Sequence, residues 1–380
     1  MVYIVKNNGS MCILVVSQVF KELDGPKPAS APYDTNTCFF HFVYPYLHFS
    51  MEYKLNHRHF SIIYVFYFSF PIALNQDENY PQIMIIDAHA HIFSTLSGFG
   101  ADGELKPLSN GKAIWSTGEV IQLLPEEYEK TEFSISSLLS LMDKNNIDKA
   151  VLLQGGFLGF DNHGVWEGVE KHRDRIRGAF TVDPFCRNVD KILGNLLSKD
   201  IDTFKFEVST GCGLMGIHHS FPLDGDMMYA IYKRLYTKVK TLAFDLGSPG
   251  DDSHQVDAIR RIAEDFPSFN IVVCHLSSPR RNQDDNLKRE LDTLSLSNIY
   301  FDTAALWWKT RPEEYPFGIA RRYLEYARNI VGAEHLMWGS DVPSTLVRVP
   351  LSKQLDYSDG IFSERESEWY YYKTAEKVYF

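Results

Sequence analysis

Residues 85–91 constrain the fold more than any other part of this sequence. They form an apolar run that leads into Asp87, His89 and His91, which are spaced two residues apart. Alternate residues of a β-strand share a face, so the two imidazoles are predicted to point the same way, with Asp87. Two imidazoles on one face can bind a divalent metal. We interpret the segment as the first strand of a barrel.

A repeated alternation of apolar strands and amphipathic helices follows. Ser134 is predicted to cap the first helix, and Gly332 is predicted to end a later one. Seven further strands are predicted at 149–154, 176–182, 203–208, 241–245, 270–275, 298–302 and 335–341. Such alternation indicates a parallel α/β sheet, and eight units favour a (β/α)8 TIM barrel spanning residues 84–380. An open doubly wound sheet would usually carry a GxGxxG turn after its first strand, and that turn is missing here.

Charge and cysteine content narrow the function classes. The net charge of -11 argues against nucleic-acid binding, because proteins that bind nucleic acids usually present a basic surface. A small-molecule substrate is therefore the expected partner. The 5 cysteines are an odd number without a CxxC pair, which fits a reducing, cytoplasmic compartment. The most apolar stretch, residues 60–70, is too short for a stable membrane span. Homo-oligomerisation is left open.

Residues 1–83 do not resemble the rest of the chain. They are rich in Phe and Tyr, poor in charge, and lack a clean helical or alternating period. Three interpretations are open: a membrane-associating leader, a poorly ordered extension, or translated sequence upstream of the true start. We favour the third, because Met84 directly precedes the first predicted strand. Detection of peptides from residues 1–83 in the native host would contradict it.

Polar side chains follow the apolar runs at the strand ends. In a barrel of this kind the catalytic residues lie at the carboxyl ends of the strands. Burial of such groups without partners would be costly, so their convergence predicts a metal-binding or proton-transfer site. The residues are Asp87, His89, His91, Lys205, Glu207, Asp245, His275, Asp302 and Asp341.

Three motifs in this order resemble the amidohydrolase superfamily. They are the Asp-Ala-His-Ala-His segment ending at His91, the Val-Val-Cys-His-Leu segment around His275, and the Trp-Gly-Ser-Asp-Val-Pro segment around Asp341. The sequence is most similar to the amidohydrolase-related branch, which holds decarboxylases of aromatic acids and lactone hydrolases. The resemblance covers residues 84–380, including the tail from Lys373 to Tyr379.

The resemblance implies one divalent metal, zinc in the first instance, with manganese as the alternative. His89, His91 and Asp341 would be ligands, and Asp341 would also accept a proton from water. His275 would polarise the scissile group or orient the substrate. The alternatives are purely structural roles. His89 and His91 would be buried histidines with hydrogen-bond partners, His275 would be structural, and Asp341 would cap a turn before Pro343.

Asp245 departs from the family pattern. The family often places a histidine ligand at the end of strand five, and here that position is Asp245. A carboxylate can bind Zn²⁺ or Mn²⁺, so Asp245 is a candidate fourth ligand. A metal-free site is the other outcome, because some members of the branch hydrolyse lactones without a metal.

Lys205, Glu207 and Trp307 are candidate substrate-binding residues. Lys205 and Glu207 share a strand face that is predicted to line the barrel interior. An internal ion pair of Lys205 with Glu207 or Asp245 is an equally good explanation. Trp307 would wall a pocket for a flat substrate or pack between helices. Cys274 precedes His275, so strict alternation predicts that it faces outward.

Three function hypotheses are consistent with these residues. The first is a metal-dependent hydrolase that uses an activated water on an ester, lactone or amide bond of a small carboxylate-bearing substrate. The second is a metal-dependent decarboxylase of an aromatic or heterocyclic acid, with Asp341 or His275 as the proton donor. The third is a barrel whose altered strand-five position has disabled its chemistry. Substrate specificity is expected to be determined by the loops at 92–133, 209–222 and 303–316.

Overall fold

The computed structural model describes residues 2–7, 10–15, 40–44, 47–56, 59–63 and 83–380. The chain divides into two compact units, Met1–Pro81 and Gln82–Phe380. In the first unit, β1 (Val2–Asn7) pairs antiparallel with β2 (Ser10–Val15), and β4 (Leu47–Asn56) pairs with β3 (Phe40–Tyr44) and β5 (His59–Ile63). Much of the segment 1–83 lies outside the described residues, so our interpretation of it stays a prediction.

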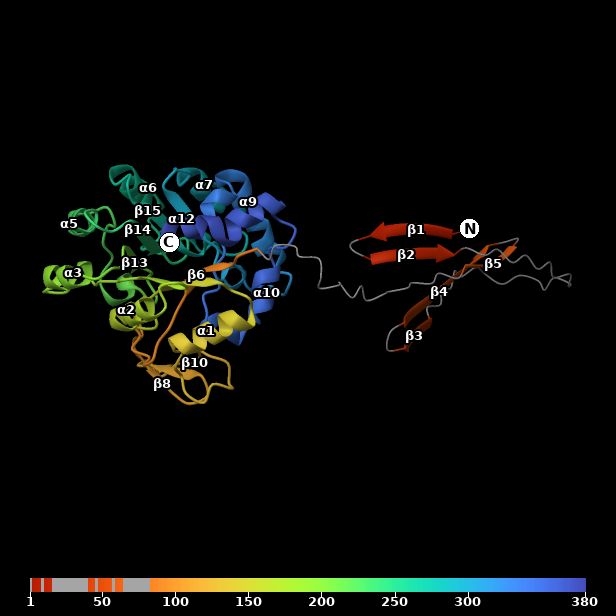
Figure 1. Cartoon of the computed structure of the whole chain (residues 1–380), viewed down its shortest axis with the longest axis horizontal. Helices are drawn as coiled ribbons and strands as arrows, with labels where there is room; N and C mark the ends of the chain where they lie inside the picture. The colour runs from red at the N-terminus through yellow and green to blue at the C-terminus, as the bar shows by residue number, and fades with distance from the viewer. Residues whose placement is uncertain (1, 8–9, 16–39, 45–46, 57–58, 64–82) are drawn as a thin grey trace. The chain divides into compact units, whose positions relative to one another are not determined.

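Eight parallel strands form the centre of the second unit (Figure 1). Hydrogen bonding orders them in two runs, β12-β11-β6 and β13-β14-β15-β16-β17. The runs are joined at both seams, where Phe180 N donates to Thr203 O at 3.0 Å and Ala88 N donates to Trp338 O at 3.0 Å. The sheet is therefore the predicted (β/α)8 barrel. Its strands are β6 (Ile86–Ala90), β11 (Lys149–Leu153), β12 (Ile176–Ala179), β13 (Thr203–Glu207), β14 (Thr241–Asp245), β15 (Asn270–Val273), β16 (Ile299–Asp302) and β17 (Leu336–Met337).

Helices follow the strands, and each of the longer ones buries one face against the barrel. Ser134 caps the first of them by accepting from Ser137 N at 3.2 Å, and that helix buries Leu138 and Met142. None of the helices in the described residues has the length and hydropathy of a membrane-spanning segment. The longer helices are α1 (Ile135–Lys144), α2 (Asn162–Lys171), α3 (Val189–Leu197), α5 (Asp226–Leu235), α6 (Val256–Asp265), α7 (Asp284–Thr293) and α9 (Gly318–Val331). The shorter ones are α4 (Leu214–Ile217), α8 (Leu306–Lys309), α10 (Leu351–Asp356), α11 (Glu364–Glu368) and α12 (Thr374–Tyr379).

The apolar core has two layers. Phe204 and Phe206 belong to the layer between strands and helices, as the sequence predicts. The layer inside the barrel contains smaller side chains, including Val151, Ala243 and Val272. The last helix, α12, adds Ala375, Val378 and Tyr379 to the inner layer.

The helix α12 closes the amino end of the barrel. Thr241, the first residue of β14, donates its hydroxyl to Val378 O at 2.7 Å. Lys149, the first residue of β11, pairs with Glu376 at 3.2 Å. With one end closed by the chain itself, a substrate has to approach the opposite, carboxyl end.

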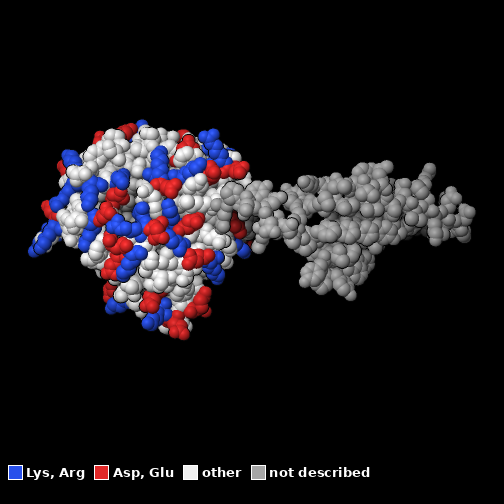
Figure 2. Space-filling model, viewed as in Figure 1, with Lys and Arg blue, Asp and Glu red and all other residues white. Residues whose placement is uncertain are grey.

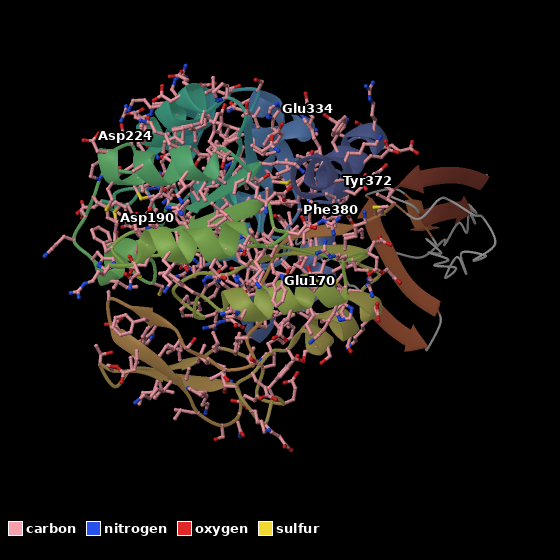
Figure 3. The ribbon with its side chains drawn as sticks, turned by 60° about the vertical axis from the view of Figure 1, so that its left-hand side comes forward. Glu170, Asp190, Asp224, Glu334, Tyr372 and Phe380 are labelled. Carbon is pink, nitrogen blue, oxygen red and sulfur yellow. The ribbon has the colours of Figure 1, made fainter. Side chains whose placement is uncertain are left out.

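The connection after β6 contains a small antiparallel sheet that projects from one side of the barrel (Figures 1 and 3). Phe99 N donates to Gly156 O and Ala101 N donates to Gly211 O, both at 2.9 Å, which ties the sheet to the loops after β11 and β13. Gly98 approaches this contact closely, since an added Cβ would lie 2.0 Å from Phe157 O. The strands are β7 (Phe99–Gly100), β8 (Gly103–Pro107), β9 (Lys112–Trp115) and β10 (Val120–Gln122).

Candidate active site

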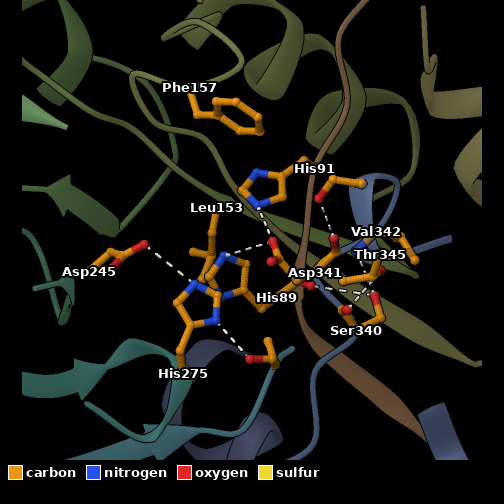
Figure 4. A network of polar contacts seen from close by, with 12 residues as sticks. His89, His91, Leu153, Phe157, Asp245, His275, Ser340, Asp341, Val342 and Thr345 are labelled. Atoms are coloured by element: carbon orange, nitrogen blue, oxygen red, sulfur yellow. Dashed lines mark hydrogen bonds and ion pairs between the residues drawn. The ribbon is translucent and has the colours of Figure 1, made fainter. Parts of the chain in front are cut away.

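His89 lies in β6 and is fully buried at the carboxyl end of the barrel (Figure 4). Its Nδ1 is 3.1 Å from Oδ2 of Asp302, the last residue of β16. Burial alone would raise the pKa of Asp302, but the hydrogen bonds from His89 Nδ1 and His275 N and the nearby imidazoles hold it below its usual value. An ionised Asp302 accepts the Nδ1 proton, so His89 presents the lone pair of its Nε2.

The carboxylate of Asp341, which follows the eighth strand of the barrel, lies close to the imidazoles of His89 and His91. Its Oδ1 lies 3.0 Å from His91 Nε2 and 4.0 Å from His89 Nε2. The backbone holds it there: Asp341 N donates to His89 O at 2.8 Å, and its φ of 60° is in the left-handed region. Such strained positions cluster at functional sites.

His275 reaches the site by an unusual backbone path. β15 ends at Val273, and His275, Leu276, Ser277 and Ser278 all have positive φ within or just after the 3-10 turn η1 (Cys274–Ser277). The ring of His275 stacks on that of His89 with centroids 4.7 Å apart. Its Nδ1 donates to Ala304 O at 2.7 Å, so Nε2 faces the site, 3.4 Å from Asp245 Oδ2.

Cys274 corrects one prediction. It belongs to the inner layer of the barrel with Val272 and lies close to His89 and Asp302. Alternation from Val272 places Cys274 inside, and the positive φ of His275 then turns the imidazole back over the mouth. Strict alternation, counted back from an inward-facing His275 on an extended strand, had placed Cys274 outside. It is buried, and burial raises the pKa of its thiol well above the usual value.

Three of the candidate residues have the geometry of a metal site. One ring nitrogen of His89, one ring nitrogen of His275 and a carboxylate oxygen of Asp341 lie within 4.8 Å of one another. Both histidines have Nδ1 engaged elsewhere, which leaves Nε2 to bind a metal. The residues therefore fit a divalent cation.

The remaining predicted ligands, His91 and Asp245, lie at the edge of this group. Buried His91 Nδ1 has no hydrogen-bond partner within the part of the chain that the structure describes. Asp245 contacts His275 and accepts from Gly247 N at 3.1 Å. The structure thus brings His275 into the ligand group beside His89 and Asp341, while His91 and Asp245 stay predicted ligands at its edge.

The electrostatics keep the imidazoles of β6 neutral. Burial lowers the pKa of His89 to about 4 and also lowers that of His91. Burial alone would raise the pKa of Asp341, but the hydrogen bond of His91 and the nearby imidazoles hold it below its usual value. Neutral imidazoles beside a carboxylate are the protonation states that bind a metal. Burial acts to lower the pKa of His275, but the charges of Asp245 and Asp341 and the hydrogen bond to Asp245 raise it above its usual value, so a metal would have to displace that proton.

Lys205 and Glu207 line the mouth without pairing with each other. Lys205 Nζ is 3.4 Å from His89 Nε2 and donates to Leu153 O at 3.2 Å. Glu207 accepts from Phe157 N at 3.4 Å, and burial raises its pKa to about 7. Among the described residues, Lys205 forms no ion pair with Glu207 or Asp245 within 4.0 Å.

Trp307 is placed in the core. It is 5% exposed and stacks on Phe317 with ring centroids 5.3 Å apart. The structure favours packing between helices over a pocket wall for this residue. Its neighbour Trp308 is half-buried.

Asp87 and Asp302 have supporting roles that the sequence did not resolve. Asp87 accepts from Ser340 N at 2.9 Å and from His89 N at 3.1 Å, so it braces the seam between β6 and β17. The sequence marks both aspartates as polar strand ends. It does not show which ones contact backbone or imidazole, because that depends on contacts between distant strands.

Comparisons with known proteins agree with this fold. A family model described as amidohydrolase matches residues 86–380. A protein from Acinetobacter baumannii, described as a probable 2-pyrone-4,6-dicarboxylic acid hydrolase with citric acid bound, is 17% identical. The match covers 77% of this chain and 98% of that one, with a TM-score of 0.57.

A second solved structure is an amidohydrolase from Burkholderia multivorans with bound zinc. It is 14% identical, and the match covers 78% of this chain and 98% of that one, with a TM-score of 0.57. At these identities the likeness shows the fold. A search among curated proteins finds no match.

Proposed function

Because the chain belongs to the amidohydrolase family, as its match over residues 86–380 shows, we propose that it is a metal-dependent hydrolase. It would act on an ester, lactone or amide bond of a small carboxylate-bearing substrate. The observation that carries the proposal is the convergence of His89, His275 and Asp341 from β6, η1 and the segment after β17. The described lactone hydrolase function of the Acinetobacter protein agrees with it.

His89, His275 and Asp341 would hold the metal, with His91 beside Asp341. Two imidazole nitrogens and a carboxylate oxygen are a donor set that suits zinc, and the Burkholderia amidohydrolase contains zinc. A divalent metal supplies polarisation of the carbonyl and a lowered pKa of water. Manganese is the alternative metal.

The side chains of the chain supply the proton handling and the orientation. Asp341 is ionised, and its carboxylate is positioned to accept a proton from the attacking water. His91 Nε2, 3.0 Å from Asp341, orients that carboxylate. Lys205 is buried beside His89, and its positive charge stabilises negative charge that develops on the carbonyl oxygen.

The test combines metal analysis with an isotope experiment. We expect the purified protein to contain close to one equivalent of metal, and His89→Ala to lose it together with turnover. Exposed His163 on α2 provides the matched control, and His163→Ala should change neither. Incorporation of ¹⁸O from labelled water into the product identifies a hydrolase. Release of CO₂ without such incorporation would identify a decarboxylase instead. Unchanged metal content and turnover in His89→Ala would reject the proposed centre. A cytoplasmic location belongs to the same proposal.

A further inference from the structure

Two arginines lie against one tryptophan at the rim of the barrel, and a lysine directly follows that tryptophan in the sequence. The guanidinium of Arg311 lies 4.2 Å from the ring centroid of Trp308, and that of Arg348 lies 5.0 Å from it. Lys309 is the next residue after Trp308 and is half-buried. Within the described part of the chain, none of these three cations has a carboxylate within ion-pair distance, and the polar contact of Arg311 is to Trp308 O at 2.9 Å.

Such a group of cations is unexpected in this chain, which has an excess of acidic residues. The sequence has 49 acidic and 38 basic side chains, and acidic and basic groups are interspersed over the face in Figure 2. Cations held close together repel one another unless an anion joins them. Burial and the charges of Arg348 and Arg280 lower the pKa of Arg311, which agrees with the crowding. Arg280 has a counterion, because its Nη2 is 3.6 Å from Asp251 Oδ1.

The cations lie on the same rim as the candidate active site. Ala304 O accepts from His275 Nδ1, and α8, which ends at Lys309, begins shortly after Ala304. Arg348 lies in the same loop as Asp341, directly after the 3-10 turn η3 (Ser344–Val347).

We propose that Lys309, Arg311 and Arg348 bind an anionic group of the substrate, a carboxylate or a phosphate, at the end remote from the reacting bond. Guanidiniums that stack on an indole keep their N–H edges available, and those edges match the oxygens of such groups. The substrate class is therefore a small molecule with at least two anionic groups. The link to catalysis rests on the proposed function, whereas the binding of the anion does not.

The first experiment measures anion binding by calorimetry without turnover. The probes are propane-1,2,3-tricarboxylate, inorganic phosphate and acetate. We expect the protein to bind the tricarboxylate more tightly than acetate, and Arg311→Gln/Arg348→Gln to weaken that binding by roughly tenfold. Lys309→Gln should weaken it as well, and added salt should weaken binding to the unmodified protein. The matched control is Arg289→Gln/Arg365→Gln, which removes two exposed arginines from α7 and α11 and should leave affinity unchanged.

The outcomes are separable from those of the proposed function. Arginine-dependent binding of phosphate above tricarboxylate would support the site and identify its anion as phosphate. Binding that survives in His89→Ala, where turnover is lost, assigns the anion to the rim instead of the metal. Wild-type affinity in a folded Arg311→Gln/Arg348→Gln variant, or equal affinity for tricarboxylate and acetate, would overturn the inference while leaving the hydrolase proposal intact.

Discussion

At the scale of single residues, Asp302 organises both imidazoles of the candidate ligand group. Its Oδ2 accepts from His89 Nδ1, and its Oδ1 accepts from His275 N at 2.9 Å and Ala304 N at 3.1 Å. Ala304 in turn accepts from His275 Nδ1 through its carbonyl. One buried carboxylate therefore determines which nitrogen of His89 faces the site and where the His275 backbone lies.

Replacement of Asp302 by asparagine should reverse the His89 tautomer. The two backbone N–H groups retain the oxygen of the introduced amide, so its NH₂ group would face His89 Nδ1 and donate to it. His89 Nε2 would then carry the proton and lose its lone pair. We expect Asp302→Asn to fold and to bind zinc roughly 10- to 100-fold more weakly, measured by competition with a chromophoric chelator. An unchanged zinc affinity would contradict this role for Asp302.

At the scale of elements, periodicity predicted the strands and helices well, because it depends on local sequence. The helix expected to end at Gly332 is α9, and the strand expected at 241–245 is β14. Alternation failed after Cys274, where it presumed extended backbone and the chain instead enters left-handed conformations at His275. Non-glycine residues carry no local signal for that conformation. The sheet β7–β10 was also missed, since the sequence of 92–133 is rich in turns and its strands are short.

Ser278 ends the left-handed run and provides a test of its strain. It has φ 51° and ψ 48°, and its buried hydroxyl has no partner among the described residues. Glycine adopts this conformation without the steric cost of a Cβ, and the substitution also removes the unpaired hydroxyl. The greater conformational entropy of glycine in the unfolded chain offsets part of this stabilisation. We expect Ser278→Gly to raise the free energy of unfolding by about 0.5–1 kcal/mol in urea titrations. Ser268→Gly, at an exposed position without positive φ, should not raise it. A less stable Ser278→Gly protein would show that the run is not strained.

The contact between α7 and α9 should make stability depend on pH. Asp284 accepts from Arg322 Nε at 2.8 Å, and this hydrogen bond holds the pKa of Asp284 below its usual value. A carboxyl group whose pKa falls on folding adds stability above its unfolded pKa of about 4, and that contribution disappears as the pH falls through the folded pKa.

Asp284→Asn should therefore destabilise the protein at pH 7 by about 0.5–1 kcal/mol, a small value because the pair is partly exposed and screened by solvent. The difference from wild type should shrink as the pH falls below about 4. Urea titrations between pH 7 and 3 measure both quantities. Neighbouring Asp285→Asn controls for the helix terminus, because that side chain is fully exposed. If the destabilisation by Asp284→Asn instead grew as the pH fell, the pKa of Asp284 would be raised on folding and not lowered.

At the scale of the whole molecule, the two ends of the barrel are used differently. The amino end is closed by α12, whose Val378 and Tyr379 are buried in the inner layer. The carboxyl end holds the candidate ligands, and the loops there contain the left-handed residues, including His275 and Asp341. Strand order and the identity of the functional end were predictable from sequence, since both follow from the alternation of eight units. The ligand set was only partly predictable, because it depends on side-chain directions at the seams between strands.

The barrel unit should fold without the residues that precede Met84. The second compact unit begins at Gln82, the family match begins at residue 86, and Met84 packs against the inner layer of the barrel. We expect a chain of residues 84–380 to melt within about 2 °C of the full chain, a difference worth less than about 1 kcal/mol for a unit of this size. Its zinc affinity should also match. A chain beginning at residue 92 lacks β6 and both of its histidines, so it should neither fold nor bind zinc. Calorimetry and chelator competition on the three chains give the answer, and a large loss of stability in 84–380 would show that the barrel needs the preceding residues.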